Sequence, residues 1–179
     1  MSKSPTIAPT RAPTWAPTLS SACVFEVSDS FDGSNIAVSF NLVQVAGGVS
    51  VTVTEVDSRL IGDIGGVFFH LKDYTKVTTV TGAKVTGVQL GNNSVYNLGS
   101  GINMSGGGTT RTYDIGVLIG TSGIGSGDDI QTTTFIVMGI TLADIDFTQD
   151  FGVRLTSVGL PTSNRGDSSK VFGFSTCRF

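Results

Sequence analysis

The stretch IAVSFNLVQVAGGVSVTVTEV, residues 36–56, decides the fold class. Apolar side chains recur at every second position on both sides of the glycine pair Gly47 and Gly48, so each half has one apolar face when it is extended. In the first half this face carries Ile36, Val38, Phe40 and Leu42. Two such halves joined by a short glycine-containing turn predict a β-hairpin.

Similar runs follow at short intervals, separated by glycine, asparagine and aspartate. The 24 glycines and the charged fraction of 14% are typical of a turn-rich β protein. We predict strands at 22–29, 35–45, 49–57, 66–72, 75–81, 85–90, 112–120, 132–139, 151–157 and 171–177. The predicted fold is all-β, a single-domain antiparallel β-sandwich of jelly-roll type.

Two other segments stand out from these strands. Thr141 could cap one short helical turn between Thr141 and Phe147, which is expected to be a connector. Residues Gly91 to Gly108 are rich in glycine and poor in apolar residues, so they are expected to form a long loop of the kind that carries binding surfaces.

The first 20 residues differ in composition from the rest of the chain. An Ala-Pro-Thr repeat places a proline at every fourth position from Pro5 to Pro17, which prevents a helix and favours extended polyproline II. Threonine beside proline is also the composition of O-glycosylated stalks. We therefore predict a Pro/Thr-rich stalk or linker over 1–20 and a β-sandwich domain over 21–179.

The two cysteines, Cys23 and Cys177, lie at opposite ends of the predicted domain. A disulfide between them would join the first strand to the last and contribute up to about 4 to 5 kcal/mol in the chain-entropy model; the alternative is two unpaired buried thiols. Disulfides persist in oxidising compartments, so we expect an extracellular or cell-surface protein. The first ten residues lack the apolar core of a secretory signal, and the natural signal is expected to be missing from this sequence.

Charge and hydropathy narrow the range of partners. Eleven basic residues against 14 acidic ones argue against binding to a nucleic-acid backbone. No apolar run approaches the roughly 18 residues needed to cross a bilayer, so membrane insertion is not expected. The expected partners are a polysaccharide or other surface proteins, and the chain could also associate with itself.

Residues for catalysis are scarce. The single histidine, His70, lies in a predicted strand, where a buried or sheet-face position is favoured over a catalytic one. The only glutamates, Glu26 and Glu55, also lie in predicted strands, and their spacing does not single them out as a glycosidase pair. We predict that the protein is not an enzyme, and a polysaccharide-active enzyme is the least favoured alternative.

Calcium is the one cofactor that the sequence supports, because this ion takes several oxygen ligands from loops. The candidate ligands are Asp128, Asp129, Asp144 and Asp146. The alternative is that these aspartates form turns and caps. Asp29 and Asp32 lie in DSFDGSN, residues 29–35, which does not follow the spacing of an EF-hand loop.

Two features of the sequence bear on carbohydrate. Sequons for N-glycosylation begin at Asn92 and Asn103, both in the predicted long loop, although sequons also occur by chance. Tyr74, Tyr96 and Tyr113 lie next to predicted loops and could stack on sugar rings or fill the core.

Several motifs resemble those of bacterial exported proteins that carry a PEP-CTERM sorting signal. They are YDIGVLIGTSGIGSGDDI at 113–130, FGVRLTSVG at 151–159 and GDSSK at 166–170, joined by GGVFFHLKD at 65–73 and VTGAKVTGVQL at 80–90. The resemblance spans roughly residues 30 to 175 and implies an exported β protein of a surface or matrix. It brings no catalytic residue, and the terminal Pro-Glu-Pro anchor of that group is not found here.

If the segment ending at Ile130 is a motif, its residues most worth testing are Gly123, Gly125, Asp128 and Asp129, with Arg154 as a candidate carboxylate partner. The Ala-Pro-Thr stalk resembles those of algal or diatom cell-surface proteins. The function expected first is a secreted, non-catalytic adhesion or structural module of a surface, wall, matrix or filament. The alternative is a calcium-dependent, lectin-like carbohydrate-binding domain.

Overall fold

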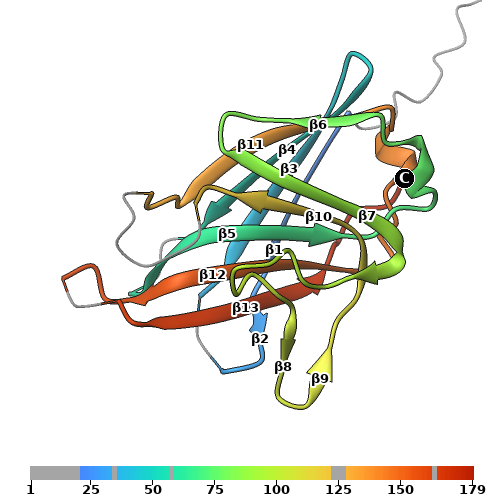
Figure 1. The fold of residues 1–179 in the computed structure, drawn as a ribbon. Helices are drawn as coiled ribbons and strands as arrows, with labels where there is room; N and C mark the ends of the chain where they lie inside the picture. The colour runs from blue at the N-terminus through green and yellow to red at the C-terminus, as the bar shows by residue number, and fades with distance from the viewer. Residues whose placement is uncertain (1–20, 34–35, 57–58, 122–127, 163–164) are drawn as a thin grey trace, which may run out of the picture.

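The computed structural model describes residues 21–33, 36–56, 59–121, 128–162 and 165–179, which fold as two antiparallel sheets packed face to face (Figure 1). The five-stranded sheet has the order β1 (Ala22–Val27), β3 (Val38–Val45), β4 (Gly48–Glu55), β11 (Thr132–Met138) and β6 (Thr79–Thr81). The six-stranded sheet has the order β2 (Asp29–Ser30), β13 (Asp167–Phe174), β12 (Asp150–Gly159), β5 (Ile61–Phe69), β10 (Tyr113–Ile119) and β7 (Val85–Val95).

This architecture confirms the predicted all-β sandwich. From β4 to β7 the chain changes sheet at every step, as the strands of a jelly roll do. A small hairpin, β8 (Ser105–Gly106) and β9 (Thr109–Thr110), stands apart from both sheets. No helix in the described ranges has the length and apolar character needed to span a membrane.

The hairpin predicted from residues 36–56 is formed by β3 and β4, whose register pairs Val45 with Gly48. Gly47 adopts a φ of +75°, which favours glycine. The alternate residues Val38, Phe40 and Leu42 are fully buried, as the period of two requires.

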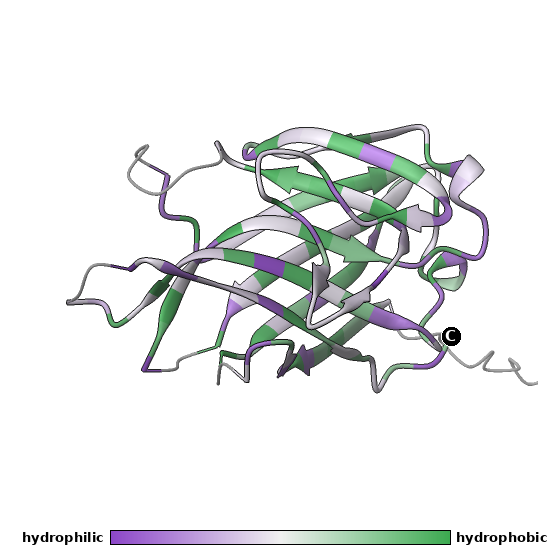
Figure 2. Cartoon of the chain, turned by 60° about the horizontal axis from the view of Figure 1, so that its bottom comes forward, coloured by the Kyte–Doolittle hydropathy of each residue, from purple (hydrophilic) through white to green (hydrophobic). Residues whose placement is uncertain are grey.

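The main core lies between the two sheets. Rings from both sheets meet at its centre: Phe151 packs against Phe25 and Phe40 at centroid distances of 4.7 and 5.3 Å. Figure 2 shows the matching alternation of apolar and polar residues along the strands. Each fully buried Val or Phe side chain contributes about 1.5–3 kcal/mol relative to an exposed one, so this core is the main source of stability.

A second, smaller core lies on the outer face of the six-stranded sheet. It joins Phe68 of β5 to Val95, Ile102, Met104 and Tyr113. Glycines in the sheet make room for this layer: a Cβ atom built on Gly66 would lie 2.5 Å from Ile102, and one built on Gly152 would lie 2.7 Å from Met104.

The prediction of one long loop over Gly91 to Gly108 is therefore wrong. β7 continues to Val95, β8 begins at Ser105, and the residues between them include buried side chains that cover the sheet.

Other boundaries differ from the prediction for local reasons. β5 begins at Ile61 rather than residue 66, although it contains three glycines, because neighbouring side chains occupy the space beside them. The predicted strand at 75–81 is preceded by the 3-10 helix η1 (Tyr74–Lys76), capped by the Asp73 side chain. The short turn predicted after Thr141 is confirmed as η2 (Leu142–Asp144).

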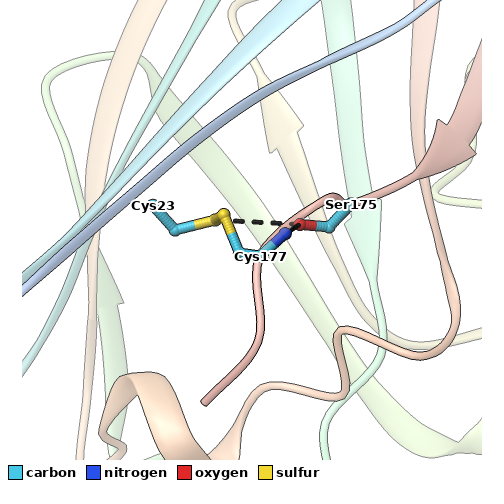
Figure 3. Close-up of a disulfide and its surroundings, with 3 residues drawn as sticks. All are labelled: Cys23, Ser175 and Cys177. Carbon is cyan, nitrogen blue, oxygen red and sulfur yellow. Dashed lines mark hydrogen bonds between the residues drawn. A yellow bond between two sulfur atoms is a disulfide. The ribbon is translucent and has the colours of Figure 1, made fainter. Parts of the chain in front are cut away.

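The disulfide between Cys23 and Cys177 is present, with a Cα–Cα distance of 6.0 Å (Figure 3). Cys23 lies on β1, an edge strand of the five-stranded sheet, and Cys177 follows β13 of the six-stranded sheet. The bond therefore joins the two sheets as well as distant parts of the chain. Ser175 supports this turn, because its Oγ accepts a hydrogen bond from the Cys177 backbone N–H at 2.9 Å.

Candidate functional site

The four aspartates predicted as one calcium site are Asp128, Asp129, Asp144 and Asp146. The structure places them at the two opposite ends of β5. Ile130, next to Asp129, donates to Asp63 near the start of that strand, whereas the carbonyl of Asp144 accepts from Lys72 beyond its end. An extended strand rises about 3.3 Å per residue, which puts roughly 30 Å between Asp63 and Lys72.

The grouping of all four aspartates is therefore corrected. Among the described residues, no group of three or more His, Cys, Asp or Glu is arranged to hold a metal ion. Asp144 is instead paired with Lys76 at 2.6 Å, which lowers the pKa of Asp144 to about 2 together with its bonds to Thr141. Asp146 accepts from the Thr148 hydroxyl at 2.6 Å, in the turn-forming role that was the alternative.

We call the end that holds Glu55, Asp63 and Asp129 the acidic end. Glu55 accepts from the Gly62 backbone N–H at 2.9 Å, and burial raises its pKa to about 7, helped by the charges of Asp129 and Asp63. Burial also raises the pKa of Asp63. Asp129 pairs with Arg165 at 2.7 Å. The predicted ligands Asp128 and Asp129 both lie toward this end, where their charges act on Asp63, and calcium stays a prediction for this end.

The opposite end, which we call the clasped end, carries the disulfide and a buried polar network around His70. The His70 side chain is 9% exposed and lies between two carboxylates, with Nδ1 3.3 Å from Asp114 and Nε2 3.8 Å from Asp150. Asp114 also accepts from the backbone N–H groups of Leu71 and Asn93, at 3.0 and 2.6 Å. The network thereby joins β5, β7, β10 and β12.

Asp150 is the second acceptor of this network. It accepts from Arg111 at 2.8 Å and from the Tyr113 hydroxyl at 3.1 Å. Burial and the charge of Asp150 raise the pKa of Tyr113 well above its usual range. The Arg111 guanidinium also lies 3.6 Å from the centroid of the Phe172 ring, a cation–π geometry that anchors the segment before β10 to β13.

Two adjoining hollows open at the clasped end, and together we call them the end groove. The first, of about 400 Å³, is lined by the rings of Phe147, Phe174 and Phe179. The second, of about 300 Å³, lies beside His70. Lys72 and Asp146 line both hollows, so the two lie side by side. Polar residues of the second hollow include Asn92, Asn93, Asp114 and Gln149.

The other residues that were predicted from the sequence as glycan or sugar-binding positions lie apart from one another. Asn92 is exposed on β7 beside the end groove, whereas Asn103 is half-buried and holds a turn by accepting from the Ser105 backbone N–H at 3.1 Å. Tyr96 is exposed, and Tyr113 is buried. Gly123 and Gly125 lie outside the described residues.

Arg154 is held differently from the prediction. Its guanidinium donates to the Ser168 hydroxyl at 2.9 Å and to the carbonyls of Gly101 and Ser169 at 3.3 and 3.2 Å. Burial lowers the pKa of Arg154, and the charge of Asp32 partly opposes this effect. The charge of Asp32 therefore acts on Arg154 alongside these three neutral oxygens.

Sequence reasoning did not find the His70 network or the end groove. One signal in the sequence could have indicated the network: Asp114 and Asp150 lie at the starts of two apolar strands, in a chain that has few charged residues. Similarity to known proteins does not assign a role to these residues either. Comparison of the chain with protein-family models, curated proteins and solved structures gave no match.

Proposed function

We propose that this protein is a secreted, non-catalytic structural or adhesion module whose disulfide carries tension that is applied along the chain. The observation that carries the proposal is the disulfide of Cys23 with Cys177, which spans 154 residues. Tension applied to the chain before Cys23 and after Cys177 passes through one covalent bridge. The folded layers between the two cysteines bear none of that load.

The disulfide also supports the proposed compartment, because such bonds persist outside the reducing cytosol. The Pro/Thr-rich composition of residues 1–20 supports a stalk role, since this composition favours an extended spacer.

The contacts of His70 support a structural role for this residue. A general base must reach the proton that it abstracts, but both ring nitrogens of His70 face buried carboxylates. Its neighbours Asp114 and Asp150 are likewise engaged with backbone N–H groups, Arg111 and Tyr113. This network serves to fix strand ends.

Single-molecule force spectroscopy tests the proposal. The full chain is held by handles before Cys23 and after Cys177, with and without reductant. Oxidised protein should show no unfolding step, whereas reduced protein should lengthen by roughly 550 Å, at about 3.6 Å for each of the 154 residues. Unfolding steps of that length in oxidised protein would contradict the load path, and two alkylatable thiols in protein from its natural source would contradict secretion with a closed bridge.

A lectin-like function is the second candidate, and the end groove is the specific observation that favours it. The predicted calcium ligands are engaged at both ends, Asp144 with Lys76 and Asp129 with Arg165, so a calcium-dependent lectin would have to displace such a partner.

A further inference from the structure

We infer that the end groove binds a saccharide chain. This inference rests on the proposed adhesion function and names the chemistry of the partner that the module holds. Hollows of about 400 and 300 Å³ fall within the range of ligand sites, roughly 300 to 1,000 Å³.

The first hollow offers aromatic surface to a ligand. Phe174, at the end of β13, is 61% exposed, and the Phe147 and Phe179 rings lie 5.1 Å apart at its wall. Single exposed apolar side chains are ordinary on protein surfaces. Here the exposed Phe174 and the half-buried Phe179 line the same hollow, and such rings can stack on the C–H face of a pyranose ring, whereas Phe147 is buried at 9% exposure and packs behind Phe179.

The second hollow offers amide groups. Within the described part of the chain, the side-chain amides of Asn92 and Gln149 make no hydrogen bond, and both residues are exposed. An amide both donates and accepts, which suits sugar hydroxyls because they do the same. By contrast, the Asn93 side chain already accepts from Thr112, and Asp146 already accepts from Thr148. Gln149 is thus the side-chain amide left to meet a ligand, and Asn92 joins it in protein that carries no glycan there.

Charges of both signs lie between the two hollows, so neutral and acidic saccharides are both candidate ligands. Lys72 donates to the Ala143 carbonyl and is not paired with a carboxylate, and Arg178 is exposed at the rim. Asp146 adds a negative charge beside them. A neutral saccharide and one built of uronic acids share the ring and hydroxyl chemistry that the groove would recognise, so the experiment separates these two sources.

The experiment is affinity gel electrophoresis of the full chain, produced without N-glycans so that Asn92 is free. The neutral probes are laminarin and hydroxyethyl cellulose, and the acidic probes are alginate and polygalacturonate. Phe174→Ala and Gln149→Ala remove one contact from each hollow. Tyr96→Ala is the matched control, because Tyr96 is an aromatic residue that is 42% exposed outside the groove.

The inference predicts that at least one polymer retards the wild-type protein and Tyr96→Ala equally. Phe174→Ala and Gln149→Ala should each weaken that retardation, Phe174→Ala by about tenfold, as expected when an aromatic stacking contact is lost. Retardation by none of the four polymers, or retardation unchanged in both groove variants, would overturn the inference. Oxidised protein that binds no polymer but shows no unfolding step under force would contradict the saccharide inference and leave the load-bearing proposal standing. Failure of the inference and failure of the proposed function are therefore distinguishable.

Discussion

At the clasped end, Asp114 and Asp150 are buried among groups that donate to them or carry positive charge, whereas at the acidic end Glu55 is partly buried beside other carboxylates. In the first case, folding supplies partners for each negative charge. In the second, folding removes water from a charge and brings like charges near it, which raises the pKa of Glu55 to about 7. Asp114 and Asp150 should therefore stabilise the fold, whereas ionised Glu55 should weaken it at neutral pH.

The largest effect should come from opening the clasped end. Replacing both cysteines, Cys23→Ser with Cys177→Ser, should lower the free energy of unfolding by about 4 to 5 kcal/mol, since the bridge closes a very long loop. Urea unfolding of the double variant and the wild-type protein measures the difference. A loss below about 1 kcal/mol would show that the unfolded chain is already constrained without the bridge.

The next effect compares one carboxylate from each end. Asp150→Ala leaves Arg111 and the Tyr113 hydroxyl without their shared acceptor, and should cost about 2 to 3 kcal/mol. Asp129→Ala removes a partner of Arg165 that is 47% exposed, and should cost at most about 1 kcal/mol. Thermal unfolding of both variants at pH 7 measures the two losses of stability. Equal losses would contradict the proposed difference between the two ends.

The third effect is a pH dependence at the acidic end. The folded-state pKa of Glu55 is about 7, above its ordinary value of 4.5. A raised carboxyl pKa means that its stabilising contribution is complete below pH 4.5 and is lost as the pH rises through 7. Glu55→Gln should therefore be more stable than wild type at pH 8 by roughly 1 kcal/mol, a value reduced for solvent screening of this partly exposed group.

Urea unfolding at pH 5 and pH 8 checks this prediction, with Glu26→Gln as the control because Glu26 is exposed on β1. The relevant quantity is the change in stability between the two pH values. If Glu55→Gln and the wild-type protein changed by the same amount, Glu55 would not be the titrating group.

The same two ends show what could be predicted from the sequence. The hairpin of β3 and β4 and the bridge between the cysteines were predictable, because an alternating pattern and a pair of residues are local or countable features. The layer over the six-stranded sheet was not, since Gly66 and Gly152 look like strand breakers until Ile102 and Met104 are seen to fill the space beside them. The partners of His70 come from distant strands, and only the register between β5, β10 and β12 brings them together.

The smallest expected effect is that of calcium on the stability of the acidic end. A cation at the acidic end would need Glu55 ionised, so binding should appear at pH 8 and vanish at pH 5. For a site of millimolar affinity, 1 mM calcium should raise the free energy of unfolding by about 0.4 kcal/mol at pH 8. Thermal unfolding in EDTA and then across a calcium titration measures this, with Asp128→Asn plus Asp129→Asn as the variant that should abolish the shift. An unchanged midpoint at 10 mM calcium and pH 8, a concentration that should give about 1.4 kcal/mol for such a site, would leave Asp128 and Asp129 as turn and ion-pair residues. Ionised Glu55 would then lower the free energy of unfolding at neutral pH, with no cation to offset this effect.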